Sequence, residues 1–207
     1  SDEQNLFTGW HTGYPDQTVR IILDSQRTIP FERNTPFFLS ELKDGEVCPR
    51  NALKKTLELL KELGFKGKSA LEYEFFLFKE TPHSVREKDF QNLVSFTPGM
   101  FGYSILRNSV QSELFQEILE MCESMDLPLE GLHTETGPGV LEAAIAADKT
   151  LKSADKAVLF KTFMKVLAQR KNLMATFMAK WSEKYPGQSG HIHCSLMDLG
   201  NNPVFST

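Results

Sequence analysis

Residues 70–78 read ALEYEFFLF, an aromatic-rich run that predicts a β-strand. Because successive side chains of a strand point to opposite faces, Glu72 and Glu74 share one face while Tyr73 and Phe75 share the other. The two carboxylates lie roughly 6.6–6.8 Å apart at their base. In an apolar strand they repel each other, and one pKa rises unless a cation lies between them. The segment therefore indicates a cation-binding strand, and an exposed acidic edge is the alternative interpretation.

A second acidic pattern surrounds a tight turn. His133 and Glu135 share a predicted strand face, and Glu142 follows the Gly-Pro-Gly sequence at 137–139. Such a turn can fold the second strand back beside the first and bring Glu135 close to Glu142. A hairpin with charged outward positions is the alternative interpretation of this segment.

A histidine pair completes the set. His191 and His193 repeat the two-residue spacing, and Gly187 and Gly190 before them permit close approach of the backbone. An isolated pair of this kind is usually structural or a surface feature, and the missing partner cysteines disfavour structural zinc. Taken together, the three patterns offer the carboxylates and imidazoles of a site for a hard divalent metal that handles phosphate.

Around these patterns the chain mixes strands and helices without an internal repeat. Apolar periodicity and turn residues predict strands over 18–23, 36–42, 70–78, 127–135, 140–146 and 190–197, helices over 51–64, 109–125 and 149–171, and a long surface excursion over 79–104. Antiparallel neighbours within 127–146 favour the α+β class, with an antiparallel or mixed sheet and flanking helices.

Composition excludes several functional classes. The chain has 207 residues and a formal net charge of −4, so it offers no basic footprint for nucleic acid. No apolar run approaches ~18 residues, which argues against a membrane span. Cys48, Cys122 and Cys194 form no CxxC pair, which predicts structural thiols in a reducing, cytoplasmic compartment.

Four motifs resemble, in their order and in their residues, those of the glutamine synthetase family of the long-chain bacterial type. They are EYEFFLF at 72–78, HTETGPGVLE at 133–142, ATFMAKW at 175–181 and HIHCSL at 191–196. The resemblance runs from about residue 15 to the last residue. It implies, over 17–207, the N-terminal part of a glutamine synthetase-like catalytic domain that is truncated at its C-terminus. The polar residues 1–16, with their glycines and proline, predict a lead-in loop.

The resemblance also implies a chemistry. Enzymes of the family phosphorylate the side-chain carboxylate of glutamate with ATP, and ammonia then displaces the phosphate with the help of two Mg²⁺ or Mn²⁺ ions. By motif position, the residues implied for one metal are Glu74, Glu135 and Glu142, those for the other metal are Glu72 and His191, and those for the nucleotide are Lys180, His193 and Ser195. The remaining ligands and the substrate-binding arginines would lie beyond residue 207, so this part alone is expected not to catalyse.

Several positions depart from the family pattern. Val140 replaces a glutamine, Ala179 and Trp181 replace prolines, and Asn108 replaces an aspartate. A tryptophan in a tight nucleotide cleft would overpack it, at a typical cost of ~1–3 kcal/mol. These changes resemble those of a lens-type member of the family that is regarded as inactive and structural. The alternatives are an active ligase for ammonia or another amine, and a sensor that keeps the ions without the chemistry.

The family resemblance implies partners as well. The expected assembly is a homo-oligomeric double ring, a dodecamer, with sites between subunits. For a lens-type member, intermediate filament proteins are further expected partners, whereas neither nucleic acid nor a membrane is expected to bind.

Overall fold

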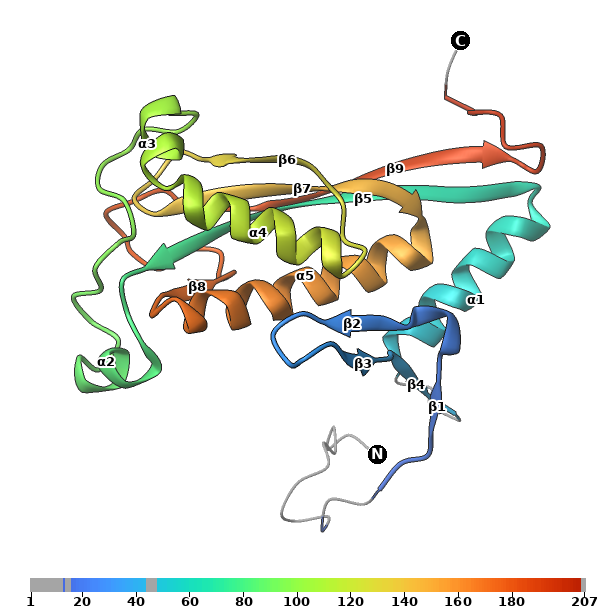
Figure 1. The fold of residues 1–207 in the computed structure, drawn as a ribbon. Helices are drawn as coiled ribbons and strands as arrows, with labels where there is room; N and C mark the ends of the chain where they lie inside the picture. The colour runs from blue at the N-terminus through green and yellow to red at the C-terminus, as the bar shows by residue number, and fades with distance from the viewer. Residues whose placement is uncertain (1–12, 14–15, 44–47, 206–207) are drawn as a thin grey trace.

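The computed structural model describes residue 13, residues 16–43 and residues 48–205, and its centre is one five-stranded antiparallel sheet (Figure 1). Its strands are, in order, β6 (Leu129–Thr134), β7 (Val140–Lys149), β5 (Phe65–Phe78) and β8 (Met174–Thr176), with β9 (Gly190–Asp198) also paired to β5. The predicted α+β class is therefore confirmed.

Two helices cover one face of this sheet, α4 (Ser112–Ser124) and α5 (Thr150–Arg170) (Figure 1). Phe75 and Leu77 of β5 are fully buried in the cluster that includes Phe160 of α5. Because side chains alternate along a strand, this packing directs the even-numbered residues of β5 to the opposite face. The helices thereby determine which face carries Glu72 and Glu74.

A smaller apolar cluster lies on that opposite face, at the end of β5. It joins Phe76 and Phe78 to Val140, and the ring of Trp181 packs edge-on against Phe78 with a centroid distance of 4.9 Å. Trp181 thus packs against aromatic rings, and the overpacked nucleotide cleft expected from the sequence stays a prediction.

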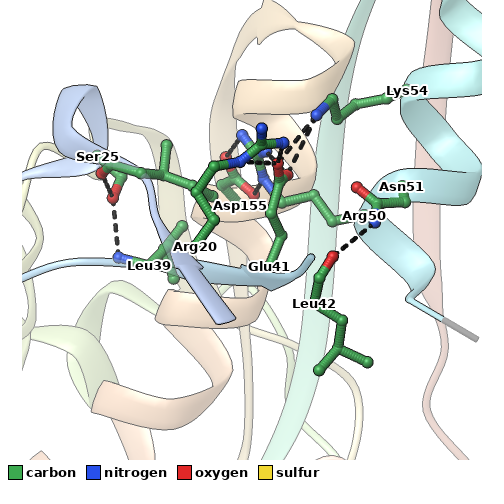
Figure 2. Close-up of polar contacts among 10 residues, drawn as sticks. Arg20, Ser25, Leu39, Glu41, Leu42, Arg50, Asn51, Lys54 and Asp155 are labelled. Carbon is green, nitrogen blue, oxygen red and sulfur yellow. Dashed lines mark hydrogen bonds and ion pairs between the residues drawn. The ribbon is translucent and has the colours of Figure 1, made fainter. Parts of the chain in front are cut away.

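The N-terminal part forms two small sheets and one helix beyond α5. The sheets pair β1 (Val19–Ile21) with β4 (Ser40–Leu42) and β2 (Arg27–Ile29) with β3 (Thr35–Phe37), and a short 3₁₀ turn (Leu23–Ser25) and α1 (Pro49–Glu62) complete this part. The buried carboxylate of Glu41, on β4, joins this strand to β1 and α1 (Figure 2).

Three cations surround Glu41. Arg20 binds one carboxylate oxygen, the Arg50 guanidinium lies 2.7 Å from the other, and the Lys54 ammonium lies 3.0 Å from the first. Arg50 also pairs with Asp155 of α5 at 3.0 Å, which connects the small sheets to the main helix layer (Figure 2). Hydrogen bonds from Arg20 and Lys54 lower the pKa of Glu41 to about 2.

Element boundaries differ from the sequence predictions in several places, and β5 begins at Phe65 rather than at residue 70. The strand expected over 36–42 is two strands, β3 and β4, which pair with different partners. The helix expected over 109–125 is α3 (Ile105–Val110) followed by α4, with a break at Gln111, whose φ is −104°. The excursion over 79–104 contains one short helix, α2 (Pro82–Glu87). The expected lead-in over 1–16 lies almost entirely outside the described residues.

Among the described residues, no helix is long and apolar enough to cross a membrane.

Candidate functional site

Strand register places the acidic motifs side by side on the face away from α4 and α5. Glu74 of β5 lies opposite Glu142 of β7, and Glu142 in turn lies opposite His133 of β6. On the other side of β5, Glu72 lies opposite His191 of β9. Three motifs that are far apart in sequence therefore meet in two neighbouring rows across the sheet.

Two groups of candidate ligands share one carboxylate. The first group is Glu72, Glu142 and His191, the second is His133, Glu135 and Glu142, and the ligand atoms within each group lie within 4.8 Å of one another. His191 Nδ1 is 3.0 Å from Glu72 Oε2, and His133 Nε2 is 3.5 Å from Glu142 Oε2. Glu142 thus belongs to both groups.

The electrostatics of these carboxylates are unequal. Burial raises the pKa of Glu142, whose side chain is 13% exposed, and the charges of Glu74, Glu72 and Glu135 raise it further, although His133 opposes the shift. Hydrogen bonds from His193 and His191 instead lower the pKa of Glu72. The raised pKa of Glu142 means that its charge is not fully compensated by the neighbouring groups.

Glu135 has an unused oxygen. Its Oε2 atom is buried and has no hydrogen-bond partner among the described residues. Burial alone would raise the pKa of Glu135, but hydrogen bonds from Thr136 and Tyr103 hold it below the usual value. An ionised, buried oxygen without a donor is suited to a cation.

The structure adds one residue that the sequence analysis missed, Tyr103. Its ring stacks on His133 with a centroid distance of 4.7 Å, and hydrogen bonding to Glu135 raises the pKa of Tyr103 to about 12. Its φ of +54° places it in the left-handed region. The sequence feature that could have pointed to Tyr103 is the glycine before it, Gly102. In the structure, a Cβ added at Gly102 would lie 3.0 Å from the Thr136 nitrogen.

The three residues expected at the nucleotide are placed differently from one another. His193 lies beside the metal candidates, with Nε2 3.1 Å from Glu72 Oε2. Ser195 lies further along β9, opposite Lys68, and Lys180 is exposed in the segment after β8. No hydrogen bond or ion pair within the described part of the chain joins Ser195 or Lys180 to the four glutamates.

Glu74 belongs to neither close group, and its carboxylate accepts two hydrogen bonds from Ser189. The Ser189 N–H donates to Glu74 Oε2 at 2.9 Å, and the Ser189 hydroxyl donates to Oε1 at 3.2 Å. The Glu74 N–H donates to the Ser189 carbonyl at 3.1 Å. Ser189 is the second residue near the site that the motifs did not indicate.

Comparison with known proteins identifies the class to which this fold and site belong. Residues 46–207 match the family model described as "Glutamine synthetase, catalytic domain". The match covers well over half of the chain, so the chain belongs to the glutamine synthetase catalytic-domain family.

Two relatives of this chain carry the names of different ligases. The chain is 46% identical over 192 residues to "Type-1 glutamine synthetase 2" of Dictyostelium discoideum, covering 90% of this chain and 37% of that protein. It is 35% identical over 205 residues to "Glutamate--isopropylamine ligase" of Pseudomonas sp, covering 97% and 45% respectively. The chain thus spans less than half the length of these relatives.

A solved structure shares the fold. The cryo-EM structure of Plasmodium falciparum glutamine synthetase superposes with a TM-score of 0.76 at 21% identity, covering 99% of this chain and 45% of that one. At this identity the likeness concerns the fold alone.

Proposed function

We propose that this protein is an ATP-dependent ligase that joins the side-chain carboxylate of glutamate to ammonia or to another amine. The observation that carries the proposal is the cluster of carboxylates and imidazoles that β5, β6, β7 and β9 place on one face of the sheet. The names of the relatives, a glutamine synthetase and a glutamate–isopropylamine ligase, support this alternative over the inactive lens-type interpretation.

The donor set fits hard divalent cations. It consists of carboxylate oxygens and imidazole nitrogens, and it includes the unpartnered Oε2 of Glu135. We propose that Glu74, Glu135 and Glu142 hold one cation and that Glu72 and His191 hold the other. Mg²⁺ or Mn²⁺, when bound, would polarise the phosphates of ATP and neutralise the charge that develops during transfer.

Residues of this chain would support that chemistry by orientation and shielding. His133 lies between Glu135 and Glu142, with Nδ1 3.9 Å from Glu135 Oε2, and it can steady both carboxylates. The Tyr103 ring stacked on His133 shields that imidazole from water. Lys180, His193 and Ser195 remain the proposed nucleotide contacts, and of these His193 is the one that lies beside Glu72.

The packing of Trp181 bears on the choice between an active and an inactive protein. Its ring packs on Phe76 and Phe78 and stacks on Tyr185 with a centroid distance of 5.6 Å. An aromatic cluster that accommodates this side chain is compatible with an altered but working ligase.

The ligase proposal is tested by phosphate release from ATP in the full-length protein. Glutamate is supplied with ammonia or with isopropylamine, and Mg²⁺ and Mn²⁺ are compared. Turnover that requires both glutamate and an amine supports the proposal, and the preferred amine defines the substrate. A folded protein that releases no phosphate with either amine would overturn it in favour of the inactive scaffold.

A binding experiment tests the metal assignment separately. Glu74→Ala is expected to abolish tight Mn²⁺ binding in calorimetry, because a ligand carboxylate is lost. Glu130→Ala, an exposed glutamate on β6, is the matched control and should bind as the wild type does. Unchanged affinity in Glu74→Ala would remove Glu74 from the metal set.

The proposed assembly is a homo-oligomer. Exposed apolar side chains gather on α3 and the segment before it, namely Phe101 (68% exposed), Ile105 (83%), Leu106 (73%) and Val110 (71%). Such a group is typical of a surface that binds another protein chain. A double ring, a dodecamer, is the proposed form and is tested by native mass spectrometry, while filament partners and a cytoplasmic setting stay predictions.

A further inference from the structure

The carboxylate of Glu74 is oriented by one residue that no motif assigns. Ser189 gives one donor to each oxygen, its N–H to Oε2 and its hydroxyl to Oε1. An ionised carboxylate accepts hydrogen bonds and donates none, so both Ser189 groups act as donors. Two donors from one residue fix the plane of the carboxylate as well as its position.

The backbone around Ser189 is itself held in place. The Gln188 N–H donates to the Ala179 carbonyl at 2.8 Å, and the Gln188 side-chain amide donates to the Thr176 and Met178 carbonyls at 3.3 and 2.8 Å. At Gly187, an added Cβ would lie 2.6 Å from the Ala179 oxygen. The segment 187–190 is therefore tied through Gln188 to the chain that leaves β8.

The Ser189 hydroxyl also reaches the second group of candidate ligands. Its oxygen lies 3.4 Å from His191 Nε2, while His191 Nδ1 lies 3.0 Å from Glu72 Oε2. One hydroxyl thus contacts Glu74 on one side and His191 on the other. These two residues are proposed to hold different cations.

We infer that Ser189 is a positioning residue, which orients Glu74 and links the two proposed cation positions through His191. Outer partners of this kind hold metal ligands in their binding orientation, and their loss typically weakens metal affinity about 10–100-fold. The inference rests on the proposed function, because Glu74 and His191 matter here as metal ligands.

The test is Mn²⁺ binding to Ser189→Ala in the full-length protein. This variant removes the hydroxyl but keeps the backbone N–H bond to Glu74, so the loss should be near the lower end, about tenfold. Calorimetry and the electron paramagnetic resonance signal of free Mn²⁺ report the two binding steps separately. Both steps should weaken, because the hydroxyl contacts a proposed ligand of each cation.

Two further variants separate positioning from folding. Ser189→Thr keeps the hydroxyl and should restore most of the affinity. Ser182→Ala removes a hydroxyl of the same connecting region, one that accepts the Lys184 N–H at 3.2 Å, and it should bind Mn²⁺ as the wild type does. Thermal melting of all variants shows whether each has folded.

The outcomes are distinct. Mn²⁺ affinity in Ser189→Ala equal to that of the wild type overturns the positioning role while leaving the metal-dependent function intact. Weakening in Ser189→Ala that Ser189→Thr does not reverse also overturns it, because the hydroxyl is then not responsible. A wild-type protein that binds no Mn²⁺ overturns the proposed function itself, and the role of Ser189 with it.

Discussion

The Glu41 network and the carboxylates on the sheet face both crowd charge into a small volume, but they balance it differently. Glu41 is 4% exposed and is surrounded by Arg20, Arg50 and Lys54 (Figure 2). On the sheet face, Glu72, Glu74, Glu135 and Glu142 lie together. No lysine or arginine of the described chain pairs with them, and their only ion-pair partners there are histidines.

The pKa values follow this difference. Cations lower the pKa of Glu41 to about 2, so its charge is stabilised by the fold. Burial and neighbouring carboxylates raise the pKa of Glu142, so its charge is tolerated at a cost. The charge of Glu41 is compensated within the chain, whereas the proposed metal site leaves charge that a cation could compensate. Three predictions test this comparison.

The largest effect is expected from Glu41→Ala. It would leave Arg20, Arg50 and Lys54 without their shared partner, and breaking such a buried group costs about 3 kcal/mol of unfolding free energy. Urea unfolding measures the loss, and Glu32→Ala, at an exposed glutamate of the same region, should stay within about 0.5 kcal/mol of the wild type. An equally small loss for Glu41→Ala would mean that the network contributes little.

A smaller effect of opposite sign is expected from Glu142→Gln. It removes a negative charge from among other carboxylates, so the metal-free protein should gain about 1 kcal/mol in unfolding free energy, as at other sites that trade stability for activity. Mn²⁺ affinity should fall at least about tenfold, because Glu142 belongs to both ligand groups. A destabilised variant would show that the carboxylate is compensated within the fold.

The smallest effect is the pH dependence of the differences in unfolding free energy between these variants and the wild type. The pKa of Glu41 is lowered from 4.5 to about 2, so its stabilisation is complete above pH 4.5 and is lost as the pH falls toward 2. The pKa of Glu142 is raised above 4.5, so its unfavourable contribution is absent below that pH and grows as the pH rises through the folded-state value.

Melting curves from pH 2.5 to 8 measure both trends. The deficit of Glu41→Ala should shrink toward the acid end, and the gain of Glu142→Gln should shrink below pH 4.5 as well. A gain of Glu142→Gln that is largest in acid would contradict the raised pKa.

The sequence predicted the long elements, because these rest on local patterns, while the roles of the site residues stay predictions. The strand at 70–78, the helix at 149–171 and the strand at 190–197 lie within two residues of β5's C-terminal part, α5 and β9. The split between β3 and β4 was missed because their pairing with β2 and β1 is set by long-range hydrogen bonds. Element boundaries depend on such contacts more than on local propensity.

Alternation along single strands was enough to place Glu72 with Glu74, and His191 with His193, since a period of two needs only neighbouring residues. The sequence could not determine which strands would lie side by side. Register placed Glu142 opposite both Glu74 and His133, and it placed His191 opposite Glu72. The contacts of Tyr103 with His133, of Ser189 with Glu74 and of Arg50 with Asp155 likewise join residues 30 or more positions apart. Such contacts form only when the whole chain packs, because burial of the apolar face of β5 against α5 selects one register out of many.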